Sequence, residues 1–216
     1  MKNELATSPA IHIPGTGRPP GWRGQFAHPS GIRGRIVGYL MALKNKERSW
    51  WVLPLLDIHQ KDRVLEVGFG PGVDIRRVSE IAVDGFVAGV DHSPLMVEQA
   101  RRRNAAAIRE GRVELAPGSA RRLPYPDESF NKVFCINVAQ FWSDPVETMR
   151  EMRRVLRTGG LMAIAVQPRS KGANERSARD MGRWLVDNMR AAGFSEVRLE
   201  SKRMKPVSTV CAVGVK

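Results

Sequence analysis

The run from Val64 to Gly72 (Val-Leu-Glu-Val-Gly-Phe-Gly-Pro-Gly) constrains the fold of this chain more than any other segment. Its apolar and β-branched residues predict a buried strand that carries Glu66 near its end and leads into a turn with three glycines. Glycine lets a backbone turn sharply and lie against a ligand, where a Cβ would intrude. The helix that follows directs its N-terminal amides toward the same place. The segment therefore predicts the first strand–turn–helix unit of a nucleotide-binding α/β domain.

The spacing of the glycines indicates which class of nucleotide this turn can bind. A dinucleotide-binding turn has the pattern Gly-x-Gly-x-x-Gly/Ala, and its third small residue would fall on Val73, which does not fit. Glu66, two residues before Gly68, would repel a diphosphate but suits a cationic group such as an α-amino group. Both features disfavour a nicotinamide-dependent oxidoreductase.

A second carboxylate follows a second strand. Asp91 ends the run Phe86–Asp91, 23 residues after Gly68, and an acid at this point is the usual acceptor for ribose hydroxyls. Glu66 and Asp91 together indicate a nucleoside with a positively charged amino-acid tail and no phosphate. S-adenosylmethionine has that chemistry.

With these motifs, the chain resembles the class I S-adenosylmethionine-dependent methyltransferases from about Trp50 to the C-terminus. Three further segments are similar to landmarks of that family. Gly118-Ser119-Ala120 with Leu123–Phe130 is similar to the loop that brackets adenine, Lys132–Val138 to the fourth strand, and Val155–Gly160 to the turn before the fifth strand. The resemblance implies an α/β, Rossmann-like, seven-stranded and mostly parallel sheet with an antiparallel C-terminal strand and helices on both faces.

The hydrophobic pattern agrees with that architecture, because strand-like and helix-like segments alternate along the chain. We expect strands near 63–67, 86–91, 112–116, 132–137 and 161–166, and helices near 46–57, 73–82, 94–109 and 145–156. A further helix is expected from Ala178 to Ala192, with Gly193 as its C-terminal stop. A terminal hairpin of Ser195–Glu200 and Val207–Val215 is expected to follow.

The resemblance also implies a set of site residues. The cofactor is expected to contact Glu66, Gly68, Phe69, Gly70, Gly72, Asp91, His92, Met96, Ser119, Ala120 and Asn137, and the acceptor to contact Tyr39, Gln140 and Phe141. No catalytic residue is assigned, because the sulfonium methyl group is already activated and the enzyme chiefly has to orient the acceptor and exclude water. Ser119 and Asn131 each stand where the family commonly has Asp.

The chain divides into three expected stretches. Residues 1–31 are rich in Gly and Pro and predict a flexible segment. Residues 32–57 predict a helical lid, whose basic amphipathic part at Ile32–Lys44 also leaves open a peripheral contact with a membrane. Residues 58–216 predict the S-adenosylmethionine-binding methyltransferase domain.

Net charge and composition limit the kinds of binding partner that this protein can have. Lys and Arg number 35 against 22 Asp and Glu, a net charge of +13, which favours either a solvated basic surface or attraction to a polyanion. Nucleic acid is disfavoured, because the expected fourth strand ends in Asn137-Val138-Ala139-Gln140 rather than the Asn/Asp-Pro-Pro-Tyr/Phe step of amino-methylating nucleic-acid enzymes. The sequence carries no signal for an oligomeric state.

The two cysteines, Cys135 and Cys211, lie in apolar runs and predict buried thiols rather than a disulfide. The four histidines have no metal-ligand spacing, and we expect no metal site. No apolar run reaches the roughly 18 residues of a membrane span. These features predict a cytoplasmic protein with no transmembrane segment.

The function expected from these observations is transfer of a methyl group from S-adenosylmethionine to a small-molecule or lipid-related acceptor by in-line displacement. The motifs are most similar to the group that contains quinone-biosynthetic, phospholipid and small-metabolite methyltransferases. The alternatives are a nucleic-acid or protein methyltransferase that uses the basic surface, and a non-catalytic S-adenosylmethionine-binding protein.

Overall fold

The computed structural model describes residues 47–216. Residues 47–52 are helical and lead into a short 3-10 helix, η1 (Leu53–Leu56). The other helices are α3 (Val73–Ile81), α4 (Pro94–Arg103), α5 (Ala105–Arg109), η2 (Ala139–Phe141), α6 (Pro145–Val155) and α7 (Glu175–Ala191). The strands are β1 (Arg63–Val67), β2 (Phe86–Asp91), β3 (Val113–Pro117), β4 (Phe130–Ile136), β5 (Leu156–Val166), β6 (Ser195–Lys202) and β7 (Thr209–Val215).

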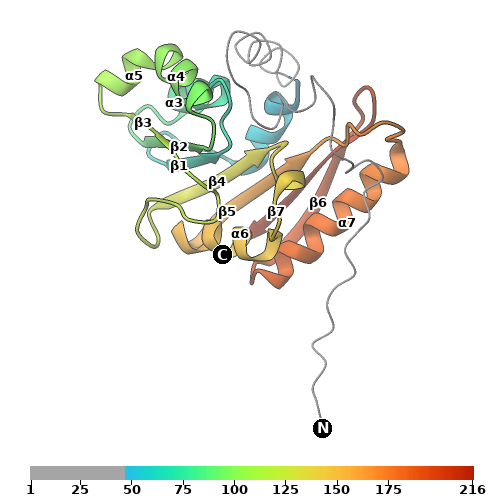
Figure 1. Cartoon of the computed structure of the whole chain (residues 1–216). Coiled ribbons are helices and arrows are strands. Elements are labelled where there is room, and N and C mark those ends of the chain that lie inside the picture. Colours follow the sequence, from blue (N-terminus) through green and yellow to red (C-terminus); the bar gives the residue numbers. More distant parts are fainter. Residues whose placement is uncertain (1–46) are drawn as a thin grey trace.

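The strands form one seven-stranded sheet in the order β3-β2-β1-β4-β5-β7-β6, shown in Figure 1. β1 to β5 are parallel neighbours, whereas β7 is antiparallel to both β5 and β6. This confirms the predicted Rossmann-like sheet with one antiparallel C-terminal strand.

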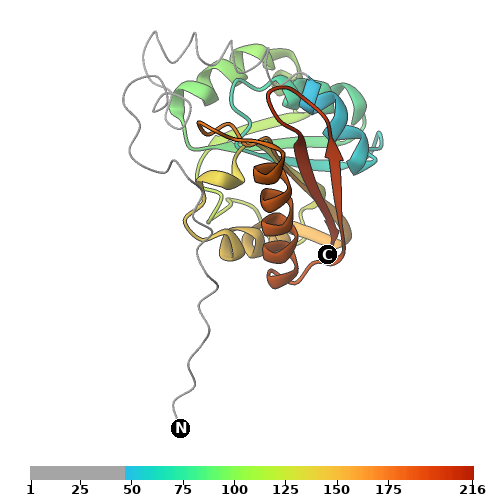
Figure 2. The ribbon, with the colours of Figure 1, turned by 90° about the vertical axis from the view of Figure 1, so that its right-hand side faces the viewer.

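Successive residues of each buried strand point to opposite faces of the sheet, so both faces carry apolar side chains. Helices pack on both faces and cover these side chains. One core joins Leu65 and Val133 to the apolar sides of α6 and α7. The other joins Val64 and Phe134 to α3, α4 and the segment before β1. Figure 2 shows α7 lying along the terminal hairpin of β6 and β7.

Two elements differ markedly from the sequence prediction, whereas the other boundaries differ by three residues or fewer. The helix expected over 94–109 is two helices, since it breaks at Asn104, whose side-chain amide donates to Gly72 O (3.0 Å) and Ala100 O (2.8 Å). β5 begins at Leu156 rather than near 161, because Leu156 already pairs with Phe130 of β4.

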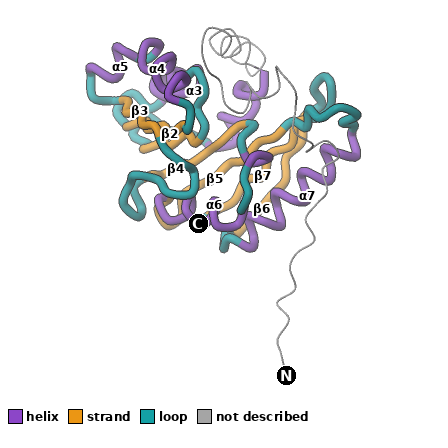
Figure 3. The backbone as a smooth tube through the Cα atoms, in the orientation of Figure 1, coloured by secondary structure: helices purple, strands orange, loops and turns teal. Residues whose placement is uncertain are grey.

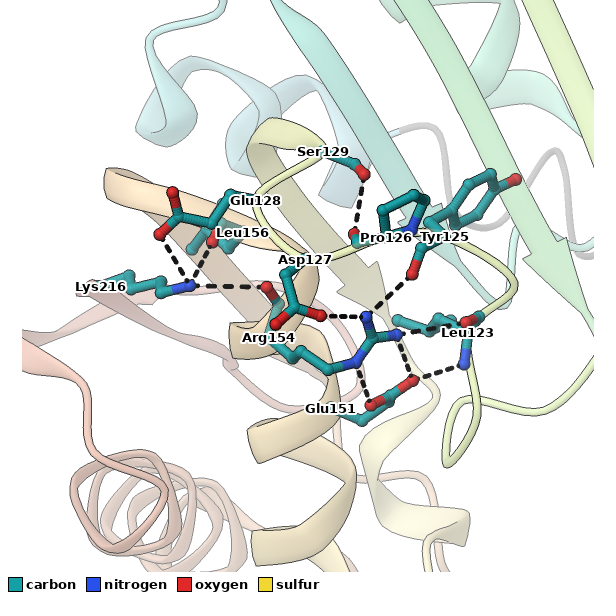
Figure 4. Close-up of polar contacts among 10 residues, drawn as sticks. All are labelled: Leu123, Tyr125, Pro126, Asp127, Glu128, Ser129, Glu151, Arg154, Leu156 and Lys216. Carbon is teal, nitrogen blue, oxygen red and sulfur yellow. Dashed lines mark hydrogen bonds and ion pairs between the residues drawn. The ribbon is translucent and has the colours of Figure 1, made fainter.

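The connection between β3 and β4 is a loop without a helix (Figure 3). Arg154, in the last turn of α6, holds it in place (Figure 4): the guanidinium donates to Tyr125 O (2.9 Å), to Leu123 O (3.3 Å) and to the carboxylate of Asp127 (2.7 Å). Glu151 binds the same guanidinium and also accepts from Leu123 N (2.7 Å). The far part of this loop therefore lies against the end of α6 and the start of β5.

Within residues 47–216, none of the helices is long and apolar enough to cross a bilayer. The same residues bring together no group of three His, Cys, Asp or Glu side chains able to hold a metal ion. Cys135 and Cys211 are free thiols buried in the sheet, as their apolar surroundings predicted.

Candidate functional site

The carboxyl ends of the parallel strands meet at one edge of the sheet, where open α/β folds bind their ligands. The amide of Gly68, after β1, donates to Val90 O of β2 (2.7 Å). The amide of Gly118, after β3, donates to Asp91 O (2.9 Å), and Asn137, after β4, donates to Ala165 O of β5 (2.8 Å). The structure thus brings the expected cofactor-binding segments to a single edge.

The three glycines of the turn after β1 all have positive φ but face different surroundings. A Cβ on Gly68 would lie 2.4 Å from Val138 Cγ2, and one on Gly72 would lie 2.5 Å from Ala100 Cβ. A Cβ on Gly70 would meet no atom of the described residues within 4 Å. Packing therefore demands glycine at 68 and 72, whereas Gly70 presents its backbone to open space, as a ligand-binding turn requires.

Glu66 is a buried carboxylate with an unused acceptor atom. Its side chain is 3% exposed, and Oε2 has no hydrogen-bond partner among the described residues. Burial raises the pKa of Glu66 well above its usual range, and the nearby carboxylates of Asp74 and Asp91 raise it further. A cationic donor beside Oε2 would satisfy this atom and offset the repulsion among the three acids.

Asp91 is buried at the end of β2 and binds the backbone on both sides. Oδ2 accepts from Gly70 N (2.8 Å), and Oδ1 accepts from Ser93 N (2.9 Å). Each carboxylate oxygen retains acceptor capacity for a further hydrogen bond. Asp91 therefore links the glycine turn to the start of α4, where Ser93 caps the helix.

The side chains of the other predicted cofactor residues differ in their solvent exposure. Phe69 is buried in the core, and its ring fills the space above Gly89, so its backbone rather than its ring borders the turn. Met96 is also buried, whereas His92 and Ser119 are exposed and Ala120 is half-buried. His92 Nδ1 lies 3.7 Å from Asp91 Oδ1.

Asn131, which stands where the family commonly has Asp, lies at the opposite edge of the sheet. Its Oδ1 accepts from Arg63 N (2.9 Å) and ties the start of β1 to the start of β4. Asn131 therefore has a structural contact far from the glycine turn.

Two of the predicted acceptor residues, Gln140 and Phe141, follow β4, and Val138 at the start of this segment lies against Gly68 of the glycine turn. Asn137 has a φ of 58°, and its Oδ1 accepts from Gln167 N (2.8 Å). Gln140 donates to Asn137 O (3.0 Å), while its Oε1 is buried without a hydrogen-bond partner in residues 47–216. Phe141 is 59% exposed. Tyr39, the third predicted acceptor residue, lies outside the described residues.

Sequence reasoning missed two sets of polar contacts beside this edge. Ser49 Oγ donates to Asp74 Oδ2 (2.7 Å) in the first turn of α3. Arg48 and Arg169 both donate to Oε1 of Gln167, the residue that follows β5. No motif marks these residues, because the contact between Arg48 and Gln167 joins positions 119 residues apart in the chain.

The fold, the glycine turn and the two acids of this edge are features of a nucleoside-binding methyltransferase, and comparison with known proteins agrees. Residues 65–164 match the family described as a methyltransferase domain. The uncharacterized methyltransferase YdaC of Bacillus subtilis is 33% identical over 181 residues, which cover 84% of this chain and 98% of YdaC. The chain belongs to the S-adenosylmethionine-dependent methyltransferases.

More distant matches agree with this family. The 27-O-demethylrifamycin SV methyltransferase of Amycolatopsis mediterranei is 31% identical, and the match covers 61% of this chain but only 50% of that enzyme. The crystal structure of an S-adenosylmethionine-dependent methyltransferase from Aquifex aeolicus has the same fold, with a TM-score of 0.60, 21% identity, and coverage of 77% of this chain and 88% of that one.

Proposed function

We propose that this protein transfers the methyl group of S-adenosylmethionine to a small-molecule or lipid-related acceptor, with both ligands held at the carboxyl edge of β1, β2 and β4. The observation that carries the proposal is the buried Oε2 of Glu66, which has no hydrogen-bond partner among residues 47–216. It lies beside a glycine turn whose middle residue, Gly70, faces no atom of those residues within 4 Å of an added Cβ. An α-amino group is the kind of donor that fits this oxygen.

Each cofactor contact follows from the chemistry of the edge. Glu66 would accept from the amino group, and the free backbone face of Gly70 would lie against the amino-acid tail. Asp91 would accept the ribose hydroxyls with the acceptor capacity left over from its two backbone bonds. Bound S-adenosylmethionine supplies a methyl group on a sulfonium, so the protein's task is to orient the acceptor and exclude water.

The acceptor would lie over the residues after β4. The buried Oε1 of Gln140 can accept from an O–H or N–H group of the acceptor, and the exposed ring of Phe141 offers an apolar surface. The rifamycin-methylating relative is named for a small-molecule substrate, which supports an acceptor of that class. A cytoplasmic location and contact with a membrane surface stay predictions.

A binding experiment tests the cofactor assignment. S-adenosylhomocysteine and NADH are titrated by calorimetry into the wild type, Glu66→Gln and the control Glu80→Gln, which changes an exposed carboxylate of α3. We expect the wild type and Glu80→Gln to bind S-adenosylhomocysteine alike, with Glu66→Gln weaker by about tenfold, the scale of a lost charge-assisted hydrogen bond. Tighter binding of NADH than of S-adenosylhomocysteine would overturn the assignment.

A labelling experiment identifies the acceptor. Methyl-labelled cofactor is incubated with the protein and separate metabolite, lipid, nucleic-acid and protein fractions, and the labelled product is identified by mass. Label in the metabolite or lipid fraction supports the proposal. Label only in nucleic acid or protein would favour the basic surface as the acceptor site, and no label in any fraction would favour a binding protein.

A further inference from the structure

Two guanidinium groups converge on one neutral oxygen at the acceptor side of the site. Arg48 Nη1 donates to Gln167 Oε1 at 2.5 Å. Arg169 donates to the same oxygen through Nε (3.0 Å) and Nη2 (2.9 Å). An amide oxygen has two lone pairs, so three donors from two cations exceed what it can accept at full strength.

The side-chain amide of Gln167 is fixed in this orientation by its other contacts. Its Nε2 donates to Lys205 O (3.1 Å) and to Val207 O (2.6 Å), which accept but cannot donate. Rotating the amide by 180° would place its NH₂ group against the two arginines and its oxygen against the two carbonyls. Gln167 therefore presents its oxygen to the arginines and holds both guanidiniums in place.

The like charges of the pair are close enough to affect each other. Arg48 is 2% exposed, and burial, followed by repulsion from Arg169, lowers its pKa to about 10 despite attraction to Glu47 and Asp74. Partial burial also lowers the pKa of Arg169, although its side chain as a whole is exposed. Asp74 is already bound by Ser49 and Arg77. An anion beside the two guanidiniums would relieve this repulsion.

The position of the pair connects it to the proposed acceptor site. Gln167 N donates to Asn137 Oδ1, and Gln140 donates to Asn137 O, so one chain of hydrogen bonds joins the arginines to the residues after β4. Arg169 is exposed and stands where a solute can reach it, with the charge of Arg48 buried behind it. The net charge of +13 also attracts anions toward the molecule.

We propose that Arg169 and Arg48 bind an anionic group, a carboxylate or a phosphate, on the methyl acceptor. Arg169 contacts this group directly, in the forked geometry that guanidinium offers to such anions, and Arg48 adds a fixed positive charge behind it. The acceptor is therefore an acid. This inference rests on the proposed function, since it takes the edge after β4 as the acceptor site.

The test measures anion binding with and without saturating S-adenosylhomocysteine. Inorganic phosphate and benzoate are titrated into ¹⁵N-labelled full-length protein, and dissociation constants are read from the side-chain amide resonances of Gln167. The variants are Arg169→Gln, Arg169→Lys and the matched control Arg102→Gln, which removes one exposed positive charge from α4. The affinity of each variant for S-adenosylhomocysteine is measured in parallel.

We expect at least one of the two anions to bind the wild type and Arg102→Gln equally. Arg169→Gln should weaken that binding by about tenfold or more, with Arg169→Lys between the two, while affinity for S-adenosylhomocysteine stays unchanged. Preference for phosphate or for benzoate then identifies the anion.

Two results would overturn the proposal: failure of both anions to bind the wild type, or equal loss in Arg169→Gln and Arg102→Gln. Failure of the wild type to bind S-adenosylhomocysteine would instead contradict the proposed function, and the anion titration without that ligand would still decide the role of the arginines.

Discussion

The carboxylate of Asp91 accepts a hydrogen bond of 2.8 Å from the backbone amide of Gly70. The acid at the end of β2 thus supports the turn after β1 directly, and its other oxygen supports the start of α4 through Ser93 N. One side chain therefore supports both the glycine turn and the start of α4.

This double contact changes what a substitution at Asp91 should do. Asp91→Ala should weaken S-adenosylhomocysteine binding by about 1–3 kcal/mol and also lower the free energy of unfolding by a similar amount, since two buried amides lose their acceptor. Calorimetry and thermal denaturation measure the two effects. Wild-type binding by Asp91→Ala would show that the acid does not contact the cofactor.

Substitutions at Gly68 and Gly70 should distinguish the effect of packing on stability from the effect of ligand contact on binding. Gly70→Ala adds a Cβ into open space and should cost only about 1–2 kcal/mol of stability, from its positive φ, yet it should sharply reduce S-adenosylhomocysteine binding. Gly68→Ala should destabilise the fold more, by about 2–5 kcal/mol, because its Cβ collides with Val138 as well. Denaturation and calorimetry on both variants test this, and an unaltered dissociation constant for Gly70→Ala would contradict it.

Cofactor affinity should depend on pH through Glu66. The raised pKa of Glu66 favours its neutral form in the free protein, whereas an ammonium group at Oε2 favours the ionised form. Binding should then release a proton, and affinity for S-adenosylhomocysteine should rise with pH between the pKa of the bound form and the raised pKa of the free form. Calorimetry in buffers of different ionisation enthalpy measures the release.

The same raised pKa has a consequence for stability. The stabilisation that the neutral form provides is fully present below the ordinary pKa of Glu and is lost as pH rises through the raised value. Glu66→Gln should remove this loss together with the proton release. Equal proton release in the wild type and Glu66→Gln would rule out Glu66 as the titrating group.

Arg154 should matter for stability and not for ligand binding. Arg154→Ala removes the donor shared by Leu123 O, Tyr125 O and Asp127 (Figure 4) and should lower the free energy of unfolding by about 1–3 kcal/mol. The control Arg150→Ala, at an exposed position of α6, should change it by less than about 0.5 kcal/mol. A large loss of S-adenosylhomocysteine affinity in Arg154→Ala would contradict this prediction and show that the position of the loop after β3 affects cofactor binding.

The N-terminal segment should control acceptor access. Removal of residues 1–45 should leave S-adenosylhomocysteine affinity within a few-fold and strip activity on the acceptor, as expected if the segment acts as a lid. Residues 47–56, in contrast, contribute the buried side chains of Val52, Leu53 and Leu56 to the core and should not be removed. Full acceptor activity in the truncated protein would contradict the lid.

The sequence was sufficient to predict the seven-stranded sheet and the methyltransferase family. Continuous apolar and β-branched runs located β1 and β2, and Glu66 and Asp91 lie near the ends of these runs. The break at Asn104 could not be predicted, because it depends on a bond to Gly72 O across the fold. The convergence of Arg48 and Arg169 on Gln167 also results from tertiary packing, and no motif in the sequence predicts it.

The place of β7 between β5 and β6 has a consequence for synthesis. β6 is translated before β7, yet β7 is its one pairing partner within residues 47–216. The ribosome therefore produces an edge strand before the neighbour with which it pairs. During that interval, its alternating charges, Glu196, Arg198, Glu200 and Lys202, oppose pairing with a strand from another nascent chain. β7, translated after β6, is thus the strand that joins β6 to the rest of the sheet. Until β7 is made, the charges of β6 disfavour intermolecular strand pairing.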